Sequence, residues 1–127
     1  MGSPTRTDRT AVAARTESGR LCTVTVERDP LGRHLLRYDG SETAVAELTP
    51  EVVELLTVAL SLRGRSAVPA RCPGGGACTL LVIGHLHGRT SLHFHAASAT
   101  SAVLDAKGTQ KLRAAVESLT GEGPGRG

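Results

Sequence analysis

The sequence predicts an α+β fold made of two copies of a unit in which strands precede a helix. Three observations support this prediction. The chain repeats itself at an offset of 56 residues, apolar residues alternate along several short segments, and helix-start signals follow those segments in both copies. We expect antiparallel sheets, two helices packed on one sheet face, and a pseudo-two-fold relation between the copies.

The repeat is visible without gaps. AVAAR at 11–15 aligns with AVPAR at 67–71, and Cys22-Thr23 aligns with Cys78-Thr79. Between 11–64 and 67–120, 15 of 54 aligned positions are identical, where chance would give about 4. We therefore expect one domain over 11–120 made of these two repeats. The polar, Gly- and Pro-containing ends, 1–10 and 121–127, are predicted to be disordered tails.

Each copy is expected to contain a short apolar segment, three further strands and a helix. The segments are 11–15, 21–27, 34–38 and 43–48 in the first copy, and 67–71, 78–83, 91–95 and 101–104 in the second. Thr49, followed by Pro50, is typical of a helix start, and Asp105 stands at the equivalent position. Gly64 and Gly121 are candidate helix stops.

Alternation selects the same buried face in both copies. Apolar side chains occupy the even positions of the strands, so we expect these residues beneath the helices: Cys22, Val24, Val26, Leu36, Tyr38, Ala44, Ala46, Leu48, Cys78, Leu80, Val82, Leu92, Phe94, Ala102 and Leu104. An odd-length turn around Gly88 keeps this pattern, and a two-residue turn would break it.

The first helix, PEVVELLTVALSL, is apolar on nearly all sides, unlike the amphipathic second helix. Such a helix lies at the centre of a core or is covered by another chain. We expect a homodimer or another protein partner at a surface formed by Val52, Val53, Leu55, Val58, Leu81 and Ile83. On this hypothesis, Val53→Glu with Leu55→Lys yields a soluble monomer.

Four of the five histidines lie in GHLHGRTSLHFH: His85, His87, His93 and His95. The odd-length turn is expected to place all four on one outer sheet face. Three interpretations stay open: a solvated or partner-facing surface, a site for Zn²⁺, Ni²⁺ or Cu²⁺, and a charge switch near pH 6. The metal site lacks a nearby acid for its outer shell, because no Asp or Glu lies between Glu54 and Asp105.

The net charge is +3, and the excess of positive charge lies in the second half, where 7 Lys and Arg residues stand against 3 acids. The order of strands and helix, taken twice, resembles that of the Whirly and PUR-repeat single-strand nucleic-acid binders. The resemblance implies a second hypothesis, nucleic-acid binding, with candidate phosphate contacts at Arg33, Arg37, Arg65, Arg71 and Arg89. Base stacking would require exposed aromatic side chains, whereas Tyr38 and Phe94 are both expected in the core.

Catalytic motifs are absent from the sequence, so we expect a non-enzymatic protein with no catalytic residues and no organic cofactor. No apolar run is long enough to span a membrane, and the start lacks a signal-peptide pattern, which favours a cytoplasmic protein. Three cysteines do not indicate a disulfide framework. Cys72, beside Arg71 in a glycine-rich loop, is the most reactive thiol on this interpretation. The leading function is a regulatory or protein-interaction module that self-associates.

Overall fold

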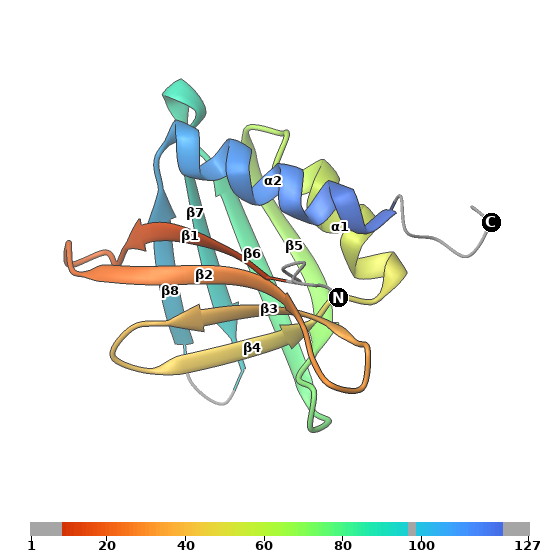
Figure 1. Ribbon diagram of the computed structural model, residues 1–127. Helices are drawn as coiled ribbons and strands as arrows, with labels where there is room; N and C mark the ends of the chain where they lie inside the picture. Colours follow the sequence, from red (N-terminus) through yellow and green to blue (C-terminus); the bar gives the residue numbers. More distant parts are fainter. Residues whose placement is uncertain (1–8, 97–98, 121–127) are drawn as a thin grey trace, which may run out of the picture.

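The computed structural model describes residues 9–96 and 99–120, which form one eight-stranded antiparallel sheet and two α-helices (Figure 1). The strand order across the sheet is β4-β3-β2-β1-β8-β7-β6-β5. The elements in chain order are β1 (Arg9–Arg15), β2 (Leu21–Arg28), β3 (His34–Asp39), β4 (Thr43–Glu47), α1 (Pro50–Ala59), β5 (Gly64–Arg71), β6 (Ala77–Gly84), the 3₁₀ turn η1 (Leu86–Gly88), β7 (Thr90–His95), β8 (Ala99–Leu104) and α2 (Ala106–Thr120). The α+β class and the antiparallel pairing are therefore confirmed.

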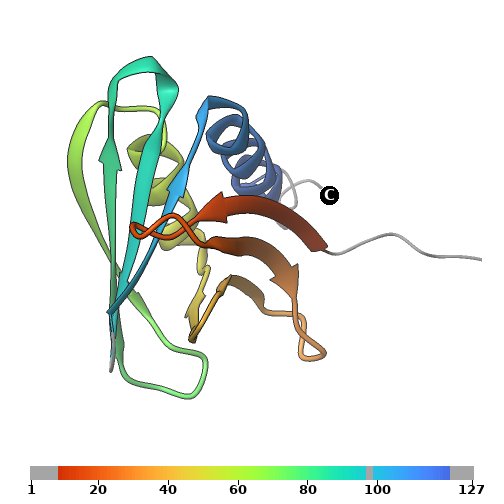
Figure 2. The same ribbon diagram turned by 90° about the vertical axis from the view of Figure 1, so that its left-hand side faces the viewer.

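Four strands followed by a helix occur twice along the chain, and each group of four strands is a meander of neighbouring hairpins. Among the described residues, strand pairing joins the two groups only between β1 and β8, where Arg15 is opposite Val103. Figure 2 shows the two groups lying at an angle, with both helices on the concave side of the sheet. The edge strands β4 and β5 also approach each other, so the sheet is nearly closed.

The register confirms the predicted parity of the core. Val24 pairs with Val12 and Tyr38, and Leu80 pairs with Val68 and Phe94, all with side chains on the helix side. The largest fully buried apolar side chains of the strands occupy even positions: Val12, Val24, Leu36, Val68, Leu80, Val82, Leu92, Phe94 and Leu104. Two odd-position residues are also buried, Thr25 and Leu35, because strand neighbours cover them on the other face.

Both helices begin where the capping signals predict. The hydroxyl of Thr49 accepts the N–H of Val52 at 3.3 Å, and the carboxylate of Asp105 accepts the N–H of Gly108 at 2.7 Å. The first helix ends earlier than expected. It stops at Ala59, and the chain then forms tight i→i+3 hydrogen bonds before Gly64, with φ of 94°, opens β5. Gly121 lies outside the described residues.

The structure corrects two sequence predictions in this region. Val52 and Val53 are only 5% and 3% exposed and belong to the internal core, so they are not part of a surface between chains. The apolar character of α1 arises largely because it packs against α2, β5 and β6 at once. The expected N-terminal tail is also too long, since Arg9 and Thr10 already pair with β2. Residues 1–8 and 121–127 lie outside the described part of the chain.

Candidate functional site

The outer face of β5–β8 is the sheet surface opposite the helices, formed by the odd-numbered side chains of these strands. Leu81 lies at its centre, opposite Ala67 on one side and His93 on the other. The neighbouring row places Ile83 between Arg65 and Ser91. Most of these side chains are half-buried between their strand neighbours. We define this face by Arg65, Ala67, Leu81, Ile83, Ser91, His93, His95, Ser101 and Val103.

The outer face of β1–β4 has a different chemistry. Arg37 lies 3.2 Å from Glu27 and 3.4 Å from Asp39, and Arg9 lies 4.0 Å from Glu27. Burial of the paired groups is partial, so each pair contributes little stability on its own. The face is nonetheless covered by a network of opposite charges, which favours contact with water over packing against an apolar surface.

Residues 56 positions apart occupy equivalent places on the two outer faces, and the carboxylates of the first face have no counterpart on the second. Ile83 is at the place of Glu27, His95 at that of Asp39, and Val103 at that of Glu47. Leu81 likewise takes the place of Thr25, and His93 the place of Arg37. The second face is therefore more apolar. Its permanently charged side chains in the described strands are Arg65 and Arg71, which lie near opposite ends of β5.

The histidines divide between this face and the adjoining turn. His93 and His95 alternate with the core residues of β7, and their ring centroids lie 6.0 Å apart. His85 follows β6, and its Nε2 lies 2.8 Å from the hydroxyl of Ser91. His87 does not lie on the sheet. It occupies the η1 turn with a left-handed backbone, φ of 62°, so the prediction that all four share one face is wrong for this residue.

The turn itself confirms the odd-length prediction. Gly84 pairs with Thr90, which leaves five residues in the connection and places Leu80 and Val82 opposite Phe94 and Leu92. The 3₁₀ turn within the connection is what separates His87 from the other imidazoles.

The imidazole of His93 is held in its neutral form. Burial lowers its pKa below the ordinary 6.5, and the nearby His95, Arg65 and His85 lower it further, while Glu17 opposes them. Protonating His93 therefore places a charge on a surface that otherwise carries few.

Metal-ligand geometry is not present on this face. Within residues 9–96 and 99–120, no group of three or more His, Cys, Asp or Glu side chains is close enough to hold a metal ion. His87 lies in a separate turn, and His85 is engaged by Ser91. The four histidines therefore do not come together as a metal site within the described residues.

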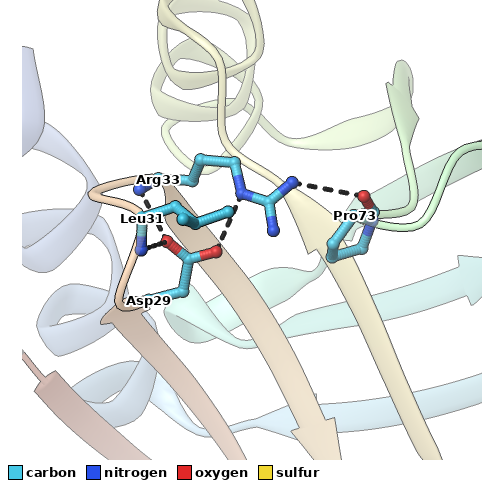
Figure 3. A network of polar contacts seen from close by, with 4 residues as sticks. All are labelled: Asp29, Leu31, Arg33 and Pro73. Carbon is cyan, nitrogen blue, oxygen red and sulfur yellow. Dashed lines mark hydrogen bonds and ion pairs between the residues drawn. The ribbon is translucent and has the colours of Figure 1, made fainter.

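Arg33, one of the candidate phosphate contacts, instead ties two turns together (Figure 3). Its Nε donates to the Asp29 carboxylate at 2.8 Å, and its Nη1 donates to the carbonyl of Pro73 at 3.2 Å. Burial raises the pKa of Asp29, but hydrogen bonds from Arg33 and Leu31 together with the charge of Arg33 outweigh it and hold the pKa below its usual value. Arg33 thus joins the β2–β3 turn to the β5–β6 turn and does not present a free cation.

The remaining candidate phosphate contacts do not form one groove. Arg37 is neutralised by Glu27 and Asp39. Arg65 and Arg71 lie near opposite ends of β5, and Arg89 follows η1. Tyr38 and Phe94 are buried, with ring centroids 6.0 Å apart, as the parity predicted. Neither ring is available to stack on a base.

Two of the predicted interface residues on α1 remain exposed. Leu55 and Val58 are 48% and 53% exposed, and Leu62 in the turn that follows is 52% exposed. They make a second apolar area, smaller than the four expected residues would have formed, because Val52 and Val53 point inward.

The cysteines are free thiols. Cys78 is buried, and burial together with the neighbouring Cys72 raises its pKa to about 11, so its thiol is unreactive at neutral pH. Burial likewise raises the pKa of Cys22, partly opposed by a hydrogen bond with Tyr38. Cys72 is half-buried and caps the glycine-rich turn through a backbone hydrogen bond to Gly76.

No protein-family model matches the chain, and no significantly similar curated protein or solved structure was found. Among the described residues, neither helix has the length and apolar character needed to cross a membrane.

Proposed function

We propose that the protein is a non-enzymatic interaction module that pairs with a second copy of itself through the outer face of β5–β8. The observation that carries this proposal is the loss of carboxylates from that face. The positions equivalent to Glu27, Asp39 and Glu47 hold Ile83, His95 and Val103. A sheet face on which neutral and apolar side chains replace charges is suited to packing against another sheet.

A second copy is the partner that this chemistry favours. Two such faces can pack together without desolvating a carboxylate, and Arg65, which is exposed at one side, can remain in water. An acidic partner would find two permanent charges, Arg65 and Arg71, at opposite ends of β5. A strongly basic partner would find no acid among the defining residues, and only Glu17 beside His93.

We further propose that the two halves arose by duplication and are related by a pseudo-two-fold axis. The 15 identities at an offset of 56, the repeated order of four strands and a helix, and the matching pairs Val12–Val24 and Val68–Leu80 support this. On this proposal the first outer face kept its ion network, and the second diverged to bind a partner. A cytoplasmic location is part of the proposal, because buried thiols persist in a reducing compartment.

The proposal is tested by returning the second face to the chemistry of the first. The double variant Leu81→Thr/Ile83→Glu copies Thr25 and Glu27 onto β6. We expect the wild-type chain to sediment as a dimer at micromolar concentration, and the variant to dissociate with a Kd at least about 30-fold higher, because truncating a central interface residue costs about 2 kcal/mol. Analytical ultracentrifugation measures both values.

Leu55→Lys is the matched control, because it makes the same kind of change on the other exposed apolar area. It should leave the dimer intact. If Leu55→Lys dissociates the dimer and the β6 variant does not, the interface lies on α1 and the proposed face is wrong. A wild-type chain that stays monomeric at concentrations up to about 100 μM would contradict self-association altogether.

Acidification should weaken the dimer. The pKa of His93 lies below the ordinary 6.5, so the imidazole is mainly neutral at pH 7. It gains a positive charge when the pH falls through that lowered pKa. That charge would meet His95, Arg65 and His85 on its own face, with Glu17 alone opposing them. We expect the Kd to rise between pH 7.5 and pH 5.5, and His93→Gln to flatten the dependence. A Kd that falls on acidification would contradict this reading.

A further inference from the structure

A shallow hollow of about 250 Å³ lies between the end of α1, the β6–β7 connection and the start of α2. Its titratable lining residues are all basic: Arg63, His85, Arg89 and Arg113. The other polar residues that line it are Ser61, Thr90, Thr109 and Gln110. No acidic residue lines this hollow.

These basic residues differ in whether a carboxylate already forms an ion pair with them. Arg63 and Arg89 are exposed and have no carboxylate within ion-pair distance among the described residues. Arg113 lies 3.4 Å from Glu117 in the next turn of α2, with both side chains about half exposed. Asp105 lines a neighbouring hollow that Arg89 also borders, and its Oδ1 is occupied by the N–H of Gly108. Within the described part of the chain, the guanidinium groups of Arg63 and Arg89 therefore have no carboxylate partner.

The backbone around the hollow is tightly built. A side chain at Gly84 would overlap the carbonyl oxygen of Leu62, so only glycine lets the α1–β5 turn rest on the end of β6. Gly88, with φ of 75°, brings the η1 turn against Ala106. Ala106 is the first residue of α2, where the positive end of the helix dipole adds to the field of the arginines.

We propose that this hollow is a binding site for a phosphate group, with Arg63 and Arg89 as its principal ligands. Guanidinium groups match phosphate in charge and in hydrogen-bond geometry, and the side chains of Gln110 and Arg113 border the same space. Because a water molecule occupies about 30 Å³, the volume admits a phosphate group and part of the molecule that carries it. The phosphate is either free inorganic phosphate or the terminal group of a phosphomonoester. The site is separate from the outer face of β5–β8 and stands independently of the dimer.

The test is a titration of the ¹⁵N-labelled protein with inorganic phosphate at pH 7.5 and constant ionic strength, followed by amide chemical shifts. Saturable shifts are expected at Arg63, from Gly84 to Thr90, and from Ala106 to Arg113. The variant Arg63→Gln/Arg89→Gln should weaken binding at least tenfold. Its matched control is Arg20→Gln/Arg71→Gln, which removes two exposed arginines from elsewhere and should bind phosphate like the wild type.

Two further titrations identify the source of the phosphate. Phenyl phosphate binding as tightly as inorganic phosphate, or more tightly, supports a phosphomonoester ligand, and tighter binding of inorganic phosphate supports the free ion. The proposal is overturned if acetate binds as well as phosphate, if shifts spread over all basic residues without saturating, or if both double variants lose affinity equally. The amide spectrum of each variant reports its folding in the same experiment.

Discussion

Val53→Glu is expected to unfold the protein. Val53 is 3% exposed, and from α1 it faces the core. The substitution forfeits about 1.5–3 kcal/mol of apolar burial and forces a carboxylate into a site without a partner. Since domains are stable by only about 5–15 kcal/mol, the two costs together remove most or all of the stability.

The neighbouring Leu55 supplies the contrast. It is 48% exposed on the same helix, so Leu55→Glu should change the free energy of unfolding by less than about 1 kcal/mol. Urea denaturation followed by circular dichroism separates the two cases. A Val53→Glu variant that folds with wild-type midpoint and slope would mean that the face belongs to a contact between chains, as the sequence alone suggested.

Phe94→Ala should have a comparable effect. Phe94 is fully buried, is flanked by Leu80 and Thr100 in the sheet, and packs against Tyr38 from the other half of the chain. Removing the ring leaves a cavity where the two halves meet, and we expect a loss of about 3–5 kcal/mol in the free energy of unfolding.

Tyr38→Phe is the control for this second prediction, because it keeps the ring and removes only the hydroxyl that bonds to the Cys22 thiol. It should cost no more than about 1.5 kcal/mol. If Phe94→Ala retains full stability but loses affinity for a single-stranded oligonucleotide, Phe94 acts at the surface and the buried arrangement is wrong.

The sequence alone was enough to predict the strands, the two helix starts and the buried side of each strand. Period-two alternation determined which side of each strand faces the helices, because a shift of one residue would have exposed every apolar side chain. The capping residues Thr49 and Asp105 located both helix starts, because their side chains satisfy local N–H groups. Such local signals do not depend on what lies across the fold.

The tertiary structure decided which surfaces are free. Val52, Val53 and Val58 are the same residue type on the same helix, so the sequence does not distinguish them. Packing of α1 against α2 and β5 buries Val52 and Val53 and leaves Val58 exposed. Arg33 resembles Arg89 in the repeat, but Asp29 and the distant Pro73 occupy its guanidinium group. The hollow beside Arg63 and Arg89 joins three segments, with Gly84 21 residues after Arg63 and Ala106 16 residues after Thr90, so no local sequence pattern predicts it. Exposure and charge pairing depend on long-range contacts, and these exist only after the two halves have closed around their shared core.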